Sequence, residues 1–248
     1  MQYLDRSYRE LHRQDDLTHF KVAVKETDLD VGVRRDQYSA ELIEKTRQIV
    51  EQCREPLEKY IKEDPGFLTA LTPYEPAPYA PQIAVEMAEA ASLAGVGPMA
   101  SVAGAIAQNV GKSLAKYSRD VIVENGGDIY LRTGRIRYIG IFAGRSALGQ
   151  KLALEIRPRQ SPLGICTSSG TVGYSLSFGV ADAVIILSKS AALADAVATA
   201  SANLVHNKED LAAAVDFAIG INGVDGALAI IGDMLAFRGH VKLVPLKA

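Results

Sequence analysis

Apolar and polar side chains alternate in two stretches near the start of the chain. Phe20, Val22 and Val24 would share one face of a strand, and the same alternation returns after a short acidic turn. A period of two is typical of strands that bury one face. The pattern therefore predicts a half-buried strand pair within residues 17–38.

A helical period replaces this alternation after Ser39, a residue type that is favoured at helix N-caps. Prolines in the stretch 62–80 predict a long loop that crosses the surface or borders a cleft. Gly95, Gly97 and Pro98 predict a break between the next two helices. The predicted helices of this region cover residues 39–61, 81–94 and 99–117.

Short β-branched and apolar runs dominate the rest of the chain, with two more helices among them. Strands are predicted at 120–124, 128–132, 135–142, 151–157, 180–187, 227–231, 234–237 and 241–244, and helices at 191–205 and 208–219. The order of strands, helices and strands thus occurs twice, which is typical of an α+β fold. We expect a single domain over residues 1–248, built from two similar halves that meet near 140–165.

Composition narrows the class of protein. Of 248 residues, 48% are hydrophobic and 23% are charged, as in globular proteins. The net charge of −2 argues against a general nucleic-acid binder. Cys53 and Cys166 match no metal-ligand spacing, so a reduced, cytoplasmic protein is the simplest interpretation. We expect no signal peptide, because the first residues lack an apolar core.

The stretch 90–111 is uncharged, as a membrane segment would be. Its glycines, its proline and its polar residues make it too weakly hydrophobic for a bilayer span. The high density of small residues suggests close helix packing instead. We therefore expect no membrane contact, and packing of this stretch either within the chain or across a homodimer.

A glycine-containing turn follows the β-branched run 121–123. Asn125, Gly126, Gly127 and Asp128 favour a tight hairpin turn, since glycine reaches positive φ and Asn and Asp bond their own backbone. Two successive glycines also let a ligand approach the backbone closely. The local pattern leaves both interpretations open, a plain hairpin and a ligand-facing turn.

A basic run surrounds the strand after this turn and contains Arg132, Arg135, Arg137 and Arg145. Arg135 and Arg137 must share one face of the predicted strand 135–142. This face is either exposed to solvent or placed to bind phosphate groups.

An uncharged segment near 167–171 begins with Thr167, Ser168 and Ser169. A turn of this kind gathers hydroxyls and backbone N–H groups, which suits an anion, and a structural loop is the alternative. A catalytic nucleophile at Ser168 or Cys166 is not expected, because no histidine lies nearby in sequence.

Asp195 and Thr199 lie four residues apart in the predicted helix 191–205, so both side chains point to one face. A carboxylate and a hydroxyl at this spacing can hold one hard cation, with water and phosphate oxygens as further ligands. The alternative is structural. An acid near a helix start favours the helix dipole, and a threonine bonds back to its own turn.

Four segments in this order resemble those of the ApbE-like superfamily, whose best-known members are magnesium-dependent flavin transferases. Ala103-Gly-Ala-Ile-Ala-Gln108 is similar to a Gly-x-Ile-Ala-Lys-Gly segment, and Glu124-Asn-Gly-Gly-Asp-Ile129 to the Asn-x-Gly-Gly-Asp turn that follows it. Thr167-Ser-Ser-Gly170 matches a Thr-Ser-Gly segment. Ala181-Asp-Ala-Val-Ile-Ile-Leu187 with Ala194-Asp-Ala-Val-Ala-Thr199 resembles a strand and an Ala-Asp-Ala-x-x-Thr helix.

This resemblance implies a duplicated, two-layer architecture of the T-fold kind, with antiparallel sheets, helices packed on them and a cleft for FAD. It also implies that Mg²⁺ is held by Asp195, Thr199 and the backbone carbonyl of Ala105. In the family, the metal polarises the FAD diphosphate for attack by a threonine of an acceptor protein, and AMP leaves. The residues implied to line the flavin site are Asn125, Gly126, Gly127, Asp128, Thr167, Ser168 and Ser169.

The sequence departs from the family pattern at three places. Gln108 stands where the family has a lysine, and a His-Ile-Ile-Asp-Pro segment expected within 170–180 is missing. The family's usual secretion or lipoprotein signal is not seen either. The chain therefore resembles a compact, cytoplasmic branch of the superfamily, in which the metal pair is kept while the chemistry has changed or gone.

Three functions are consistent with these features. The first is a magnesium-dependent enzyme that acts on FAD or a related nucleotide, with FMN transfer to a protein threonine. The second is a non-catalytic protein that binds a flavin or another small ligand, which the missing His segment favours. The third is an accessory factor in sulfur or redox metabolism. No catalytic residue is assigned.

Overall fold

The computed structural model describes residues 7–144, 146, 148–149, 151–170 and 178–246. The helices are α1 (Ala40–Glu63), α2 (Pro65–Thr69), α3 (Gln82–Ala94), α4 (Val102–Leu114), α5 (Ala191–Asn203) and α6 (Leu211–Gly220). Short 3₁₀ helices are η1 (Ser7–His12), η2 (Arg35–Gln37), η3 (Pro98–Ser101), η4 (Pro158–Gln160) and η5 (Lys208–Asp210).

The strands form two antiparallel sheets. The large sheet contains β1 (Leu17–Val24), β2 (Thr27–Arg34), β3 (Val121–Asn125), β4 (Asp128–Arg132), β7 (Leu163–Ser168), β8 (Ala183–Ser188), β9 (Val224–Ile231) and β10 (Met234–Gly239), in that spatial order. The small sheet has the order β11 (Leu243–Pro245), β6 (Leu152–Ile156) and β5 (Arg137–Gly140). Helices packed on antiparallel sheets confirm the predicted α+β class.

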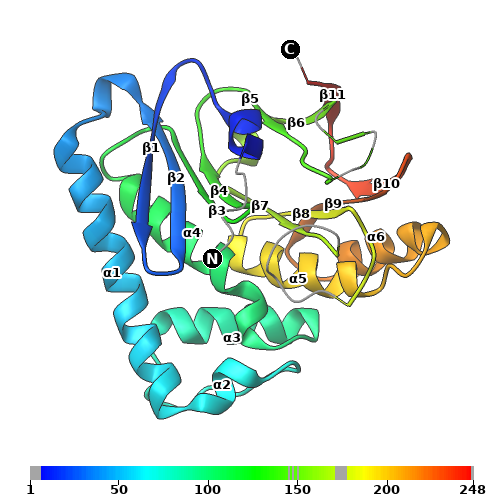
Figure 1. The fold of residues 1–248 in the computed structure, drawn as a ribbon, viewed down its shortest axis with the longest axis horizontal. Helices are drawn as coiled ribbons and strands as arrows, with labels where there is room; N and C mark the ends of the chain where they lie inside the picture. Colours follow the sequence, from blue (N-terminus) through cyan, green and yellow to red (C-terminus); the bar gives the residue numbers. More distant parts are fainter. Residues whose placement is uncertain (1–6, 145, 147, 150, 171–177, 247–248) are drawn as a thin grey trace.

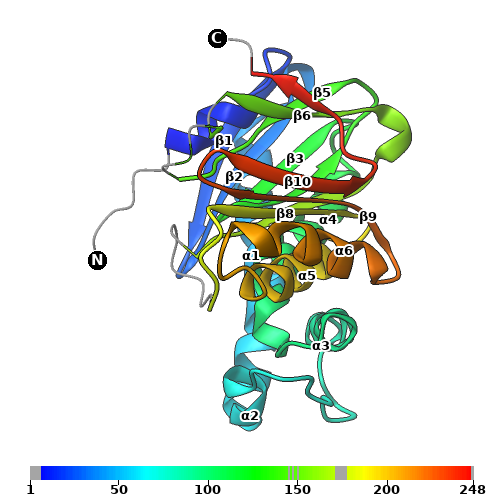
Figure 2. The same ribbon diagram turned by 90° about the vertical axis from the view of Figure 1, so that its right-hand side faces the viewer.

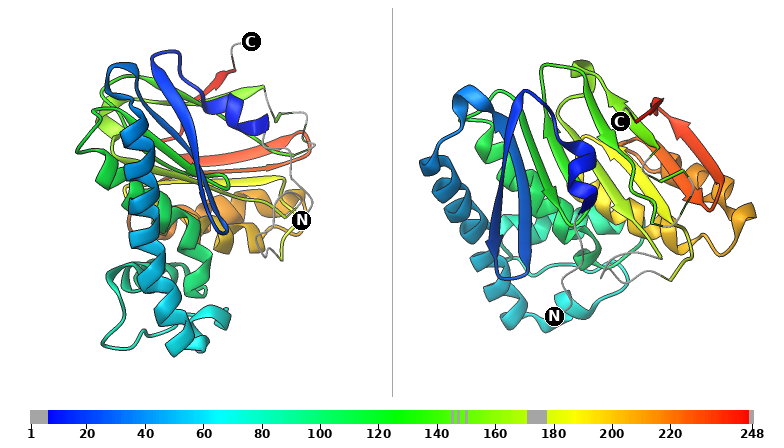
Figure 3. Two further views of the ribbon diagram at one scale, coloured as in Figure 1. Left: turned by 60° about the vertical axis from the view of Figure 1, so that its left-hand side comes forward. Right: turned by 45° about the horizontal axis from the view of Figure 1, so that its top comes forward.

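The helices and the small sheet lie on opposite faces of the large sheet (Figures 1 and 2). One apolar cluster fills the space between the large sheet and the helices, and a second fills the space between the two sheets. The segment η1 lies on the face that is opposite to the helices (Figure 3). The large sheet therefore faces the helices on one side and the N-terminal segment η1 on the other.

Local signals placed most elements correctly. The Ser39 hydroxyl accepts the N–H of Leu42 at 3.2 Å, so α1 begins where its cap predicts. Gly95 ends α3 with a φ of 74°, which confirms the predicted break. The loop expected at 62–80 differs, because it contains α2. Pro65 occupies the first turn of α2, where its fixed φ favours a helix start.

The stretch 90–111 packs within the chain, and its helices contribute many buried residues to the main core. In the described part of the chain, no single helix is long and apolar enough to cross a membrane. The helix α3 and the segment Pro98–Leu114 pass that test only together, with a bend of 100° between them. The homodimer stays a prediction. The two similar halves also stay a prediction, and the element order is consistent with them: a strand pair, helices and a second strand pair occur on each side of residues 137–156.

Candidate functional site

The glycine turn closes the hairpin of β3 and β4, as predicted. Asn125 pairs with Asp128 across the hairpin, and Gly126 and Gly127 have φ values of 68° and 108°. The Asn125 side chain donates to the carbonyl of Ala103 at 3.1 Å. An ideal Cβ on Gly126 would meet no atom within 4 Å, so the turn faces open space at that residue.

The side chain of Asp195, a residue of α5, lies beside this turn and contacts the start of α4. Its Oδ2 accepts the N–H of Gly104 at 2.8 Å, and the N–H of Ala103 also bonds to this carboxylate. Because the first N–H groups of a helix lack partners within the helix, Asp195 caps α4 from a different helix. The structural role predicted for this acid is thus real, but it serves α4 rather than α5.

A close crossing of α4 and α5 makes this contact feasible. A Cβ on Gly104 would lie 2.3 Å from the Ala191 carbonyl oxygen and 2.8 Å from the Asp195 Cβ, so only glycine permits the approach. Asp195 and Thr199 are both partly exposed, so neither is sealed in the core.

Two acids share this corner. Burial and the charge of Asp128 raise the pKa of Asp195 well above its ordinary value. Burial, together with the charge of Glu124, raises the pKa of Asp128 to about 7, although the Thr167 N–H donates to it at 3.2 Å. Among the described residues, neither carboxyl group has a basic side chain as an ion-pair partner. The corner therefore favours protons or a cation.

The residues at the end of β7 divide into two kinds. The Cys166 thiol is buried, donates to the Ala191 carbonyl at 3.2 Å, and has its pKa raised well above the ordinary value by burial and by the neighbouring acids. It is therefore a thiol rather than a nucleophilic thiolate. The Ser168 hydroxyl is buried without a partner among the described residues, and Ser169 is partly exposed.

The structure gives partners to one residue that departs from the family pattern, Gln108, and to one implied metal ligand, the Ala105 carbonyl. The Gln108 side chain accepts the N–H of Ala191 at 2.9 Å and so satisfies the first turn of α5. The Ala105 carbonyl lies in the buried part of α4 and accepts the Asn109 side-chain amide at 2.9 Å. Within the described chain, no three His, Cys, Asp or Glu side chains gather around a common metal position.

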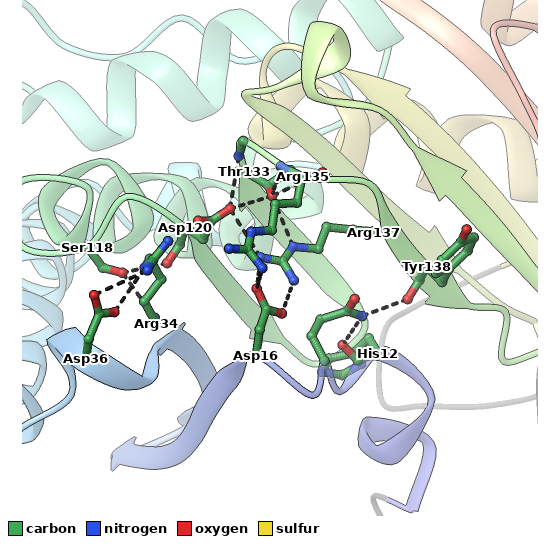
Figure 4. Close-up of polar contacts among 12 residues, drawn as sticks. His12, Asp16, Arg34, Asp36, Ser118, Asp120, Thr133, Arg135, Arg137 and Tyr138 are labelled. Atoms are coloured by element: carbon green, nitrogen blue, oxygen red, sulfur yellow. Dashed lines mark hydrogen bonds and ion pairs between the residues drawn. The ribbon is translucent and has the colours of Figure 1, made fainter.

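Arg137 has neither of the two roles predicted for the arginine run, a solvent-exposed face or a phosphate site (Figure 4). Arg137 is only 2% exposed, so its face is not a solvated one. It pairs with Asp16 and, at 3.2 Å, with Asp120, and its Nε donates to the Thr133 hydroxyl at 3.0 Å. Its donors are thus used inside the protein, because residues before β1 and the residue before β3 in the large sheet, Asp120, cover this end of β5.

The other arginines do not form a phosphate site with it. Arg135 is exposed and reaches Asp16 at 3.4 Å, and Arg132 donates to the Ala115 carbonyl at 3.1 Å. Arg145 and Thr171 lie outside the described residues.

One buried ion pair beside the glycine turn was not predicted from the sequence. Arg9 donates to Glu124 at 2.7 Å, and Glu124 accepts the N–H of Gly127 at 2.7 Å. Glu124 stands directly before the glycine motif, which is the one signal that could have drawn attention to it.

Comparisons with known proteins agree with this architecture. Residues 9–219 match the family described as "AbpE bacteria". A UPF0280 protein of Methanosphaerula palustris is 47% identical over 200 residues, which cover 80% of this chain and 83% of the relative. A UPF0280 protein of Methanococcus aeolicus is 36% identical over 230 residues and 91% of each chain.

Solved structures of low sequence identity show the same fold. The flavinyl transferase ApbE of Pseudomonas stutzeri, in its apo form, has a TM-score of 0.59 at 17% identity, over 91% of this chain and 95% of that one. The ApbE protein of Thermotoga maritima has a TM-score of 0.52 at 13% identity, over 90% and 97%. The chain belongs to the AbpE bacteria family and has the α+β fold of the ApbE flavin transferases.

Proposed function

We propose that the chain binds Mg²⁺ and FAD, or a related nucleotide, at the corner where the glycine turn meets α4 and α5. The observation that carries this proposal is the placement of Asp195 beside Asp128, with no basic side chain on either acid among the described residues. A divalent cation would offset this charge. The P. stutzeri and Vibrio cholerae structures of this fold are flavin transferases, which supports a flavin as the ligand.

The donor set suits a hard cation. Asp195 provides a carboxylate and Thr199 a hydroxyl one helical turn away, and both are partly exposed. The backbone carbonyl of Ala105 is the third proposed ligand. It lies inside α4 and accepts the Asn109 side-chain amide as well as the helical N–H of Asn109, so it would have to exchange the side-chain bond for the cation. Bound Mg²⁺ would supply charge neutralisation for a diphosphate.

The flavin nucleotide is proposed to lie over the glycine turn. Open space above Gly126 lets a flat ligand approach the backbone. Thr167 and Ser168 end β7, the strand next to β4, and Ser169 follows them. The Ser168 hydroxyl, which has no partner among the described residues, is a donor for a ligand oxygen. The residues proposed to line the site are Asn125, Gly126, Gly127, Asp128, Thr167, Ser168 and Ser169.

FMN transfer is the reaction proposed for this site. The hydroxyl oxygen of an acceptor threonine would bond to the flavin-side phosphorus of FAD, and the bond from that phosphorus to the bridging oxygen would break. AMP would leave with the bridging oxygen, and the threonine proton would pass to solvent. The missing His-Ile-Ile-Asp-Pro segment favours a second candidate, in which the protein binds the flavin without transferring it. These two candidates differ in whether AMP is released.

The test compares the wild type with Asp195→Asn. Asparagine can still accept the N–H of Gly104, so the cap of α4 is kept while the charge is removed. Asp182→Asn is the matched control, because Asp182 is also partly exposed and accepts a backbone N–H, that of Gly232 at 2.7 Å. Calorimetry would measure Mg²⁺ and FAD binding, and chromatography would detect AMP and FMN.

We expect Mg²⁺-dependent FAD binding by the wild type and by Asp182→Asn, with at least a tenfold loss in Asp195→Asn. Release of AMP with a threonine-containing acceptor would select the transferase, and binding without AMP would select the second candidate. Absence of flavin binding in the wild type with Mg²⁺ would remove the proposal.

A further inference from the structure

Arg9 is a buried cation on the face of the large sheet that is opposite to the helices. It belongs to η1, is 3% exposed, and uses three nitrogens of its guanidinium group. Nε donates to Glu124 Oε2 at 2.7 Å, Nη1 to Asp28 Oδ1 at 3.1 Å, and Nη2 to the Asp28 carbonyl at 2.7 Å. The guanidinium therefore joins the N-terminal segment, β2 and β3 at one point.

Glu124 passes this contact on to the glycine turn. Glu124 is fully buried. One of its carboxylate oxygens accepts from Arg9, and the other accepts the N–H of Gly127 at 2.7 Å. Charge-assisted bonds of this length are roughly twice as strong as neutral ones. Gly127 has a φ of 108° and no side chain, so the bond from its N–H to Glu124 adds to the Asn125–Asp128 pairing in fixing the backbone of the turn.

We propose that Arg9 and Glu124 are positioning residues, which hold the glycine turn in the shape that binds the ligand. The guanidinium fixes the carboxylate, and the carboxylate fixes the Gly127 N–H. This inference rests on the proposed function, because that function assigns the turn to the flavin site. It adds the N-terminal segment to the parts of the chain that determine ligand affinity.

Electrostatics strengthens the same argument. Glu124 is the third acid near this corner, after Asp128 and Asp195. Without Arg9, this buried carboxylate would lose the guanidinium that bonds to one of its oxygens, and proteins relieve such a loss by admitting water or by moving the chain. Either response loosens the turn and places more negative charge near an anionic ligand. Removal of Arg9 therefore weakens the binding of FAD.

The experiment uses Arg9→Ala, Arg9→Lys and a matched control, Arg54→Ala. Arg54 is also largely buried and pairs with Glu58 at 2.8 Å, but it lies on α1 and has no contact with the turn. Hydrogen exchange of the Gly127 amide, measured by NMR without ligand, reports the turn directly. Flavin fluorescence titration with FAD and Mg²⁺ reports ligand affinity, and thermal melting confirms that each variant is folded.

We expect Arg9→Ala to raise Gly127 exchange and to weaken FAD binding, each by at least tenfold. Arg9→Lys, which keeps the charge but loses the fork to Asp28, should recover part of both losses and serves as the test if Arg9→Ala does not fold. Arg54→Ala should stay within twofold of the wild type.

Wild-type exchange at Gly127 in a folded Arg9 variant would overturn the inference. Equal losses in Arg54→Ala would also overturn it, because the effect would then be one of general stability. Wild-type protein that binds no FAD would instead overturn the proposed function and the ligand part of the inference. The exchange data would still decide whether Arg9 holds the turn.

Discussion

Substitution of Gly104 by alanine should separate the two helices that form the candidate site. Gly104 is the third residue of α4, and a Cβ there would lie 2.3 Å from the Ala191 carbonyl oxygen. Ordinary contacts begin near 3.4 Å, so α4 must move about 1 Å away from α5. The bond from the Gly104 N–H to Asp195, now 2.8 Å, would then exceed hydrogen-bonding distance.

The cost can be estimated from three terms. Overpacking costs about 1–3 kcal/mol, and loss of a helix cap costs about 0.5–2 kcal/mol. Alanine regains roughly 0.5–1 kcal/mol through its better helix propensity. We therefore expect a net loss near 2 kcal/mol, which corresponds to a fall in Tm of about 4–8 °C for a chain of this size.

Calorimetric melting and Mg²⁺ titration together test this expectation. Gly220→Ala is the control, because Gly220 ends α6 and a Cβ there would meet no atom within 4 Å. Its Tm should stay unchanged or rise. A Gly104→Ala protein with the wild-type Tm would show that the two helices do not touch at this residue. Unchanged Mg²⁺ affinity in a destabilised Gly104→Ala protein would show that the position of Asp195 does not matter for the metal.

Three further substitutions test other parts of the structure. Arg137→Met leaves two acids without their buried cation and should cost about 3–5 kcal/mol, measured as a shift in the urea midpoint. Gly126→Ala meets no neighbour but keeps a φ of 68°, so melting should show only the strain of about 1–2 kcal/mol. Burial raises the pKa of Asp30, but hydrogen bonds from His12 and His19 outweigh this and hold it well below the usual value. A carboxyl group with a lowered pKa in the folded state contributes its full stability above about pH 4 and loses it as the pH falls. The difference in free energy of unfolding between wild type and Asp30→Asn, measured by urea unfolding, should therefore shrink at lower pH.

Local sequence signals were sufficient for most of the fold. Alternation gave β1 and β2, and Ser39 and Gly95 gave the ends of α1 and α3, because caps and periodicity act within a few residues. The five-residue helix α2 was missed, since the surrounding prolines dominate the pattern. The burial of Arg137 was also missed, because it depends on a second sheet that no local pattern reveals.

The sequence proposes residues for the candidate site but does not reveal their contacts. The spacing of Asp195 and Thr199 follows from the helical period. The bond from Gly104 to Asp195 joins residues that are 91 positions apart, and it depends on how closely α4 and α5 cross. The link from Arg9 through Glu124 to Gly127 spans 115 residues in its first step, so only the tertiary structure reveals it.

The cap of α4 and the proposed metal site make different demands on Asp195. A cap needs only an acceptor, and asparagine or serine would meet that need without charge. Acids that cap helices usually gain stability from the helix dipole, yet burial and Asp128 raise the pKa of Asp195 here. A second acid at the same corner therefore opposes the cap rather than supporting it. The charge is thus more than the helix requires, and the acid pair becomes favourable either by binding a proton or by binding the proposed cation, which a Mg²⁺ titration at several pH values would distinguish.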